Sequence, residues 1–477
     1  MNLVIENCRA YTSFNPPRIA TTLYIEDGVI TSVDGYGSAE KTLDLGGRTV
    51  IPSLTDSHIH LVELATQGNL LDLRSVEKKS ELLKLVSSAG ERSFIYGYGW
   101  DQEKMDALPT AEELEAASSG RPVLLERICG HVGLASLSAL RLLGPRYQAV
   151  ENSGLVSEED LQRLRKHVPK PGIEEVIESL QAFQRILLAY GLTRLHVIVM
   201  EKDHLDALER LSASGRAGLD ILCYVTPDLL PHARGLRFLR VQGVKVFVDG
   251  SLGGWTAALR QPYSDKPVKG ILRHDRKSLR QILEMCSEEG LQPAFHAIGD
   301  EAISAVLDAV EDVGGCERVR VEHASVMDDE MIKRAARLGI ILSVQPMFAV
   351  SDTWVGRRLG DRAWMCYRFR SMLSSGCILS CGSDAPVESV NPFEGLWAAV
   401  CGNPNKSERL EVWQALEAYT HGPTYASGDE NCVGRIAAGY SADLIVLDRD
   451  PLKMDPDSLK SLHPIMTIRR GRVVFTL

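Results

Sequence analysis

Two histidines at alternate positions, His58 and His60 in the run Asp56-Ser57-His58-Ile59-His60, give the strongest chemical signal in the sequence. Side chains two residues apart on an extended chain point to the same side, so both imidazoles can reach one metal ion. Such a pair also occurs in surface or core positions where hydrogen bonds satisfy the rings. The residues around the pair must therefore decide between these interpretations.

Four further polar side chains have a similar setting, because Lys245, His296, His323 and Asp384 each lie inside or just after a different apolar, strand-like run. In a closed (β/α)₈ barrel, catalytic residues gather at the C-terminal ends of the strands. These four residues and the histidine pair are therefore predicted to face one site.

Lys245 interrupts the apolar run 244–248, where burial of a charged ammonium is costly. Burial favours the neutral amine, which can take up carbon dioxide as a carbamate. A carboxylated Lys245 would be an anionic ligand that bridges two divalent cations about 3.5–4 Å apart. The alternative is an ordinary ion pair with a carboxylate such as Asp249.

Asp384, in the run Gly382-Ser383-Asp384-Ala385-Pro386, is a candidate for both metal binding and proton transfer. A carboxylate beside a metal can accept a proton from the attacking water and pass it to the leaving nitrogen. The alternative is a turn residue before proline.

Eight strand-like segments alternate with helical patterns, which predicts an α/β fold with a TIM-like (β/α)₈ barrel rather than an open doubly wound sheet. The segments are 50–60, 192–199, 219–225, 243–250, 291–299, 319–325, 340–346 and 377–386. The alternation predicts a metal-binding barrel over 51–429, with 62–190 as an inserted, mainly helical subdomain after the first barrel strand.

Short alternating β-like runs with turns occupy both chain ends, 1–50 and 430–477. Neither end is long enough to form its own core, so the two are predicted to pair into one small composite β-sandwich domain.

The composition excludes several classes of function. The 53 basic and 63 acidic side chains give a net charge of −10 without a Lys/Arg-rich run, which argues against a nucleic-acid surface. No apolar stretch reaches 18 residues and the start is unlike a signal peptide, so we expect a cytoplasmic protein without a membrane partner. The 10 cysteines contain no CxxC pair, which favours reduced core thiols.

Taken together, the motifs resemble the amidohydrolase superfamily, most closely its family 3 branch that includes N-substituted formamide deformylase-like proteins. The resemblance spans nearly the whole chain. It is carried by DSHIH, GVKVFVDGSLGG, HAIGD, VEHAS, SVQP, GSDAPV and the tail GRIAAGYSADLIVLDRDP. One departure is Leu195-His196-Val197, which stands where such proteins commonly read VHD and so lacks a usual carboxylate.

This resemblance implies a centre of two divalent metal ions with a carbon dioxide-derived carbamate on Lys245 as the bridge. It places His58 and His60 on one metal, His296 and His323 on the other, and Asp384 as a metal-contacting general base. The mixed ligand types suit Zn²⁺, although iron, manganese or cobalt would accept similar ligands.

The resemblance also implies three substrate-binding residues in the predicted insertion, Trp100, Arg127 and His131, since the matching elements lie over the substrate pocket in such proteins. For Trp100 the alternative is simple packing inside the subdomain.

The sequence thus predicts a metal-dependent hydrolase, an amidohydrolase that cleaves an amide-type C–N bond, N-acyl or N-formyl, with a metal-bridging hydroxide. The expected partners are a small-molecule substrate and, from the resemblance, a second copy in a homodimer. Fold and metals do not fix the substrate, so a lactonase, a phosphotriesterase or a deaminase remains an alternative. A centre with a single metal and a catalytically silent scaffold or regulatory relative are further alternatives.

Overall fold

The computed structural model describes residues 2–37, 39–67, 70–90, 92–128, 130–144, 153–169, 171–314 and 316–477. The chain divides into two compact units, one formed by 1–61 with 177–477 and the other by 62–176.

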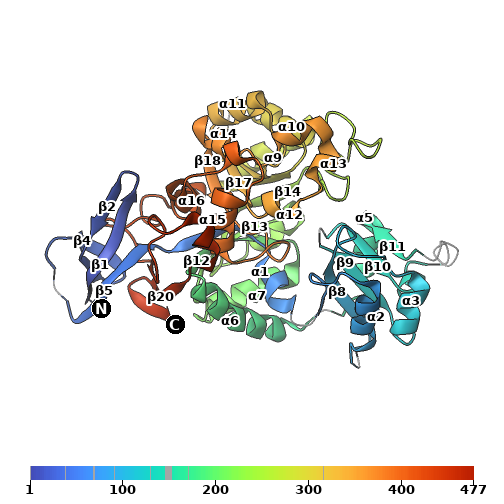
Figure 1. Cartoon of the computed structure of the whole chain (residues 1–477), viewed down its shortest axis with the longest axis horizontal. Coiled ribbons are helices and arrows are strands. Elements are labelled where there is room, and N and C mark those ends of the chain that lie inside the picture. The colour runs from blue at the N-terminus through green and yellow to red at the C-terminus, as the bar shows by residue number, and fades with distance from the viewer. Residues whose placement is uncertain are drawn as a thin grey trace. The chain divides into compact units, whose positions relative to one another are not determined.

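Eight parallel strands form the central sheet of the larger unit, in the order β18-β17-β16-β15-β14-β13-β12-β6. Figure 1 labels β12, β13, β14, β17 and β18 among them. A parallel bridge joins Ile59 of β6 to Ala385 in the segment after β18, so the sheet is nearly closed. This confirms the predicted α/β fold with a TIM-like barrel. The strands are β6 (Leu54–Ile59), β12 (Leu192–Val199), β13 (Asp220–Val225), β14 (Arg240–Phe247), β15 (Gln292–Ala297), β16 (Arg320–His323), β17 (Ile341–Val344) and β18 (Ile378–Cys381).

The barrel strands are apolar along most of their length because both of their faces are buried, one by helices and one by the barrel interior. Every residue of β12 and β15, for example, is buried. Polar residues in such strands therefore need specific partners.

Helices alternate with these strands along the chain, as the sequence pattern requires. The longer ones are α6 (Ile173–Ala189), α7 (Lys202–Ala213), α9 (Arg276–Glu289), α10 (Asp300–Asp312), α11 (Asp329–Arg337) and α16 (Val412–Tyr419). Local signals set their ends: the Asp275 carboxylate accepts the Ser278 N–H at 2.8 Å at the start of α9, and Gly290 follows that helix with φ 65°. None of the helices in the described ranges has both the length and the apolar composition of a membrane span.

Strands from both chain ends share one further sheet of the larger unit, in the order β21-β20-β19-β5-β1-β3-β4 with β2 paired to β1. Figure 1 shows the N-terminal strands in blue and β20 in red. The strands are β1 (Asn2–Phe14), β2 (Pro17–Ala20), β3 (Leu23–Glu26), β4 (Val29–Val33), β5 (Lys41–Pro52), β19 (Leu444–Leu447), β20 (Pro464–Arg469) and β21 (Arg472–Thr476). Its core includes the fully buried Ile5, Leu23, Val50, Leu444 and Ile468.

The segment predicted as one strand over 50–60 is divided between the two sheets. β5 ends at Pro52 in the end sheet, and β6 starts at Leu54 in the barrel. Between them, the Ser53 N–H donates to the Asp443 carbonyl at 2.9 Å. The apolar pattern continues through this point, so it could not show that the chain changes sheets.

The smaller unit contains a five-stranded sheet in the order β11-β10-β9-β8-β7 as well as the expected helices. The strands are β7 (Leu71–Asp72), β8 (Ile95–Trp100), β9 (Val123–Arg127), β10 (Val132–Ala135) and β11 (Leu155–Ser157). Helices α2 (Lys79–Ser87), α3 (Ala111–Ala117), α4 (Leu137–Arg141) and α5 (Glu158–Arg165) complete it. A capping box of Thr110 and Glu113 starts α3.

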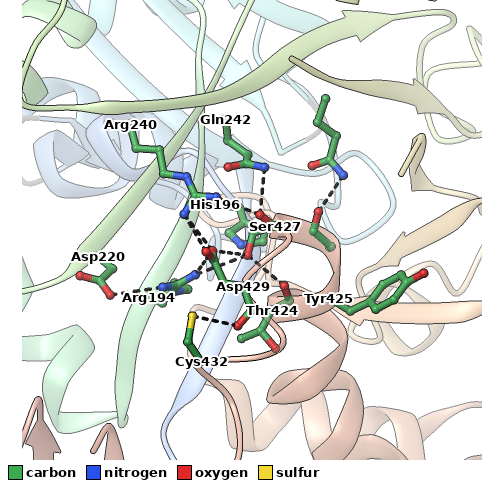
Figure 2. A network of polar contacts seen from close by, with 12 residues as sticks. Arg194, His196, Asp220, Arg240, Gln242, Thr424, Tyr425, Ser427, Asp429 and Cys432 are labelled. Atoms are coloured by element: carbon green, nitrogen blue, oxygen red, sulfur yellow. Dashed lines mark hydrogen bonds and ion pairs between the residues drawn. The ribbon is translucent and has the colours of Figure 1, made fainter. Parts of the chain in front are cut away.

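An ionic network ties together the N-terminal ends of β12, β13 and β14 (Figure 2). Asp429 accepts hydrogen bonds from Arg194 and, at 2.9 Å, from Arg240. The Ser427 hydroxyl donates to the same carboxylate at 2.8 Å. Asp220 accepts from Arg469 and lies 3.5 Å from Arg194. The network therefore links three barrel strands to the segment after α17 (His421–Ser427).

We expect Asp429→Asn to lower the free energy of unfolding by about 1–3 kcal/mol at pH 7, because it removes the carboxylate that pairs with Arg240 and leaves Arg194 only the more distant Asp220. Burial alone would raise the pKa of Asp429, but Arg194, Arg240 and Ser427 more than offset this and lower it. A lowered folded-state pKa stabilises the fold above the unfolded-state pKa of about 3.9, and the stabilisation is lost as the pH falls through the folded value.

The difference between wild type and Asp429→Asn should therefore be greatest near neutral pH and shrink below about pH 4. Urea unfolding of both proteins at several pH values measures this difference. A difference that stays constant from neutral to acid pH would contradict the proposed role of the charge.

Candidate metal centre

The six residues with the predicted metal-binding role meet at the C-terminal ends of five barrel strands. His58 lies in β6 and His60 follows it, Lys245 lies in β14, His296 in β15, His323 ends β16, and Asp384 follows β18. Ring centroids are 5.7 Å apart for His58 and His60, 5.0 Å for His58 and His323, and 4.5 Å for His296 and His323. The parallel strands thus gather four imidazoles, one amine and one carboxylate in one cluster.

His58, His60 and Asp384 form the tightest part of this cluster. Asp384 Oδ1 lies 3.3 Å from Nε2 of His58 and 3.3 Å from Nε2 of His60. The three ligand atoms all lie within 4.8 Å of one another, a spacing that could hold one metal ion. Backbone contacts fix the arrangement, because the Asp384 N–H donates to the His58 carbonyl at 2.7 Å and the His60 N–H to the Ala385 carbonyl at 2.9 Å.

The buried carboxylate of Asp56 joins the two segments that carry these three residues. It accepts the N–H of His58 at 3.1 Å, the N–H of Ser383 at 3.0 Å and the Ser383 hydroxyl at 2.6 Å. Burial raises the pKa of Asp56 to about 6, against the opposing effect of these hydrogen bonds. Asp56 therefore holds the backbone before both His58 and Asp384.

Backbone strain marks the same place. Asp384 has φ 57° and His323 has φ 72°, a left-handed backbone conformation that residues other than glycine rarely adopt. Such conformations cost of order 1–3 kcal/mol each and cluster at functional sites, where surrounding contacts hold them.

Three of the four histidines donate one ring N–H to a neighbouring group. The pairs are His58 Nδ1 with Glu322 Oε2 at 2.6 Å, His296 Nε2 with the Gly250 carbonyl at 3.0 Å, and His323 Nδ1 with Gln345 Oε1 at 2.7 Å. The Gln345 amide nitrogen donates to the Ser343 carbonyl, which fixes its oxygen towards His323. Each acceptor lacks a proton to give, so the ring nitrogen must carry it.

When one N–H of such a ring is fixed and the other nitrogen is unprotonated, that second nitrogen presents a lone pair. These nitrogens are Nε2 of His58, Nδ1 of His296 and Nε2 of His323. Metal-ligating histidines are usually held in this way by carboxylates or carbonyls. Burial lowers the pKa of His323 to about 3, so this ring is neutral near pH 7. Burial and Lys245 lower the pKa of His58, but Asp384 and Glu322 outweigh them and raise it.

Lys245 is fully buried in the same cluster, with Nζ 3.4 Å from His58 Nε2 and 5.1 Å from the centre of the Phe247 ring. Burial lowers the pKa of Lys245 to about 8, although Glu322 and Asp384 oppose the shift. Asp249, the alternative ion-pair partner, instead accepts the N–H groups of Ala258, Ile298 and Gly299 at 2.8–3.1 Å. Lys245 therefore loses its proton more readily than an exposed lysine, and its nitrogen lies beside a histidine.

This donor set fits divalent cations. Imidazole nitrogens and a carboxylate oxygen are the ligands that zinc and related metals accept, and a carboxylated lysine would add two further oxygens. The structure thus supplies donors suited to divalent metal at the C-terminal ends of the strands.

The three predicted substrate-binding residues lie in the smaller unit. Trp100 is buried there, and its indole N–H donates to the Leu125 carbonyl at 2.7 Å, as expected of a packing residue. Arg127 is buried and pairs with Asp101 at 2.9 Å and with Gln102. His131 is partly exposed. Their substrate-binding role stays a prediction.

Sequence reasoning missed the groups that orient the histidines, namely Glu322, Gln345 and the Gly250 carbonyl. One signal was present: Arg320 and Glu322 are charged residues at alternate positions of a short apolar strand, which places both side chains on one face. The Gly250 carbonyl left no such signal, because it is a backbone group in a loop.

Comparison with known proteins agrees with this geometry. Residues 41–475 match the amidohydrolase family. The chain belongs to that family. It is therefore a hydrolase, and metal dependence and small-molecule substrates follow from the family.

Individual relatives cover almost the whole chain. It is 31% identical to the amidohydrolase YtcJ of Bacillus subtilis (strain 168), over 98% of each protein. It is 26% identical to the N-substituted formamide deformylase of Arthrobacter pascens, over 93% of this chain and 92% of that protein. An uncharacterized metal-dependent hydrolase from Pyrococcus horikoshii OT3 has a crystal structure with TM-score 0.82 and 33% identity, over 96% of this amidohydrolase and 99% of that chain.

Proposed function

We propose that this amidohydrolase cleaves the C–N bond of an amide-type small molecule, N-acyl or N-formyl, at a centre of two divalent cations, with zinc as the metal. The observation that carries the proposal is the set of three imidazoles, each with one ring nitrogen hydrogen-bonded to a fixed acceptor, around the buried Lys245 and Asp384. The similarity to an N-substituted formamide deformylase supports an amide-type substrate.

The residues divide between the two cations. His58, His60 and Asp384 would hold one cation, His296 and His323 the other, and a carboxylated Lys245 would lie between them. When bound, divalent cations lower the pKa of a coordinated water to about 7 and polarise a carbonyl oxygen. Lys245 must lose its proton before it can take up carbon dioxide, and its burial makes this loss easier.

Asp384 moves the proton in the proposed reaction. Burial alone would raise its pKa, but His58, His60 and His323 hold the pKa of Asp384 well below its usual range, so the carboxylate is ionised near neutral pH. It accepts one proton of the attacking water while the oxygen adds to the substrate carbonyl carbon. The C–N bond then breaks, and Asp384 returns the proton to the departing nitrogen. The products are a carboxylic acid and an amine.

Metal content gives the direct test. We expect about two metal ions per chain by elemental analysis of two preparations, protein purified without chelator and the same protein after supplementation with Zn²⁺ and bicarbonate. Treatment with chelator should abolish hydrolysis of N-formyl and N-acyl amines, and return of the metal should restore it. Persistent absence of metal in both preparations would contradict the proposal. Turnover of lactones or phosphotriesters but not amides would instead show that the enzyme cleaves a bond other than C–N.

A further inference from the structure

Arg320 is a fully buried arginine inside the barrel, and its guanidinium contacts residues of five strands. All five of its N–H donors can be assigned acceptors. These are Glu322 Oε1 at 2.8 Å from Nε, His196 Nδ1 at 2.9 Å and the Tyr224 hydroxyl at 2.7 Å from Nη1, and the Ser57 carbonyl at 2.7 Å and the Ser343 hydroxyl at 3.0 Å from Nη2. The guanidinium is thus fixed in position by its surroundings.

Glu322 lies between this arginine and the candidate metal centre, and its side chain is also fully buried. Its Oε1 accepts from Nε of Arg320, and its Oε2 accepts both from Nη2 of Arg320 at 3.2 Å and from Nδ1 of His58 at 2.6 Å. Arg320 and Glu322 point to the same side of β16 because they stand two residues apart. Hydrogen bonds therefore connect the guanidinium of Arg320 through the carboxylate of Glu322 to Nδ1 of His58.

We propose that Arg320 and Glu322 are positioning residues, which hold His58 in the tautomer with the proton on Nδ1 and direct its Nε2 to the metal. The inference rests on the proposed metal centre. Arg320 also donates to the carbonyl of Ser57, the residue directly before His58, so it holds both the ring and the backbone of this ligand.

The charge on Glu322 is essential to this role, because the amide introduced by Glu322→Gln cannot make both contacts. If the carbonyl oxygen of this amide faced His58, its NH₂ group would face the donors of Arg320. If the NH₂ group faced His58, Nδ1 would have to accept, and the proton would move to Nε2, the nitrogen that must bind metal. Either orientation weakens His58 as a ligand.

Glu322→Gln is therefore the variant that tests the proposal, and Asp429→Asn is its matched control. Both replace a carboxylate that pairs with buried or half-buried arginine, but Asp429 lies at the N-terminal ends of the strands, in the network of Figure 2. A general loss of stability would affect both variants, whereas a loss of metal affinity should affect only Glu322→Gln.

The measurement is the Zn²⁺ dissociation constant of the metal-free proteins, by competition with a chromophoric chelator, together with the visible absorption of the Co²⁺-loaded proteins. We expect Glu322→Gln to bind Zn²⁺ roughly 10–100-fold more weakly than wild type and to alter the Co²⁺ spectrum. Asp429→Asn should bind within about threefold of wild type. Glu322→Asp keeps the charge but moves the carboxylate away from His58, so its Zn²⁺ affinity should lie between those of wild type and Glu322→Gln.

Equal affinity and an unchanged spectrum in wild type and Glu322→Gln would overturn the inference. If Glu322→Gln does not fold, Glu322→Asp decides the question, and wild-type affinity in that variant would also overturn it. A wild-type protein that binds no Zn²⁺ would instead refute the proposed metal centre, so the two failures are distinct.

Discussion

Replacing Lys245 with alanine is expected to lower kcat/KM roughly 10³-fold or more on any N-formyl or N-acyl amine that the wild type hydrolyses. The bridging ligand would be lost, and metal ions contribute several kcal/mol to transition-state stabilisation, where each 1.4 kcal/mol is a factor of ten. Metal content should fall below that of the wild type. The fold should survive, because the variant removes a fully buried amine whose burial is itself costly.

Two controls test whether the loss of activity comes from the missing bridging ligand. Lys269→Ala removes an exposed lysine and should leave both activity and metal content unchanged. Addition of acetate or propionate to Lys245→Ala should restore part of the activity, since a small carboxylate can enter the vacated space and replace the carbamate. Full turnover by Lys245→Ala without any added acid would exclude a bridging role for the lysine.

Asp384→Asn is the second substitution with a large expected effect. It removes the group that accepts and returns the proton, and general acid–base catalysis contributes typically 10²–10⁴-fold, so kcat should fall by roughly that factor. The amide also lacks the charge that faces His58 and His60 at 3.3 Å. Steady-state kinetics together with elemental analysis separate the loss of proton transfer from the loss of metal.

A fall in kcat with metal content retained would support the role of Asp384 as general base. A matched exposed variant, Asp361→Asn, should behave as wild type. If Asp384→Asn retained more than about a tenth of wild-type kcat with a full complement of metal, another group would have to accept the proton.

The barrel could be predicted from the sequence because its strands are buried on both faces and read as apolar runs. The predicted strand 192–199 matches β12 at both ends. The predicted strand 377–386 was too long, since β18 ends at Cys381 and the polar residues after it form the loop that carries Asp384. Apolar patterning locates a strand well, but it does not show where hydrogen bonding to the neighbouring strand stops.

The chemistry of the candidate centre was only partly visible in the sequence. Histidines at strand ends can be predicted to meet, because parallel strands end at the same side of a barrel. The partners that fix their tautomers come from other strands, as Glu322 and Gln345 do, or from a backbone carbonyl at Gly250. Such pairings depend on the register between strands, which a single sequence does not encode in any local pattern. The metal-binding role itself stays a prediction.

The edge strands β6 and β18 close the barrel at the place where the ligands lie. The bridge from Ile59 to Ala385, the hydrogen bond from Asp384 to His58 and the clasp of Asp56 on Ser383 all belong to the segments that carry His58, His60 and Asp384. A cation held by these three residues would therefore link the two segments at which the barrel closes. A ligand that binds only the folded state raises the free energy of unfolding by about 2.7 kcal/mol at a concentration of 100 Kd. The metal would therefore stabilise the closed barrel as well as take part in catalysis.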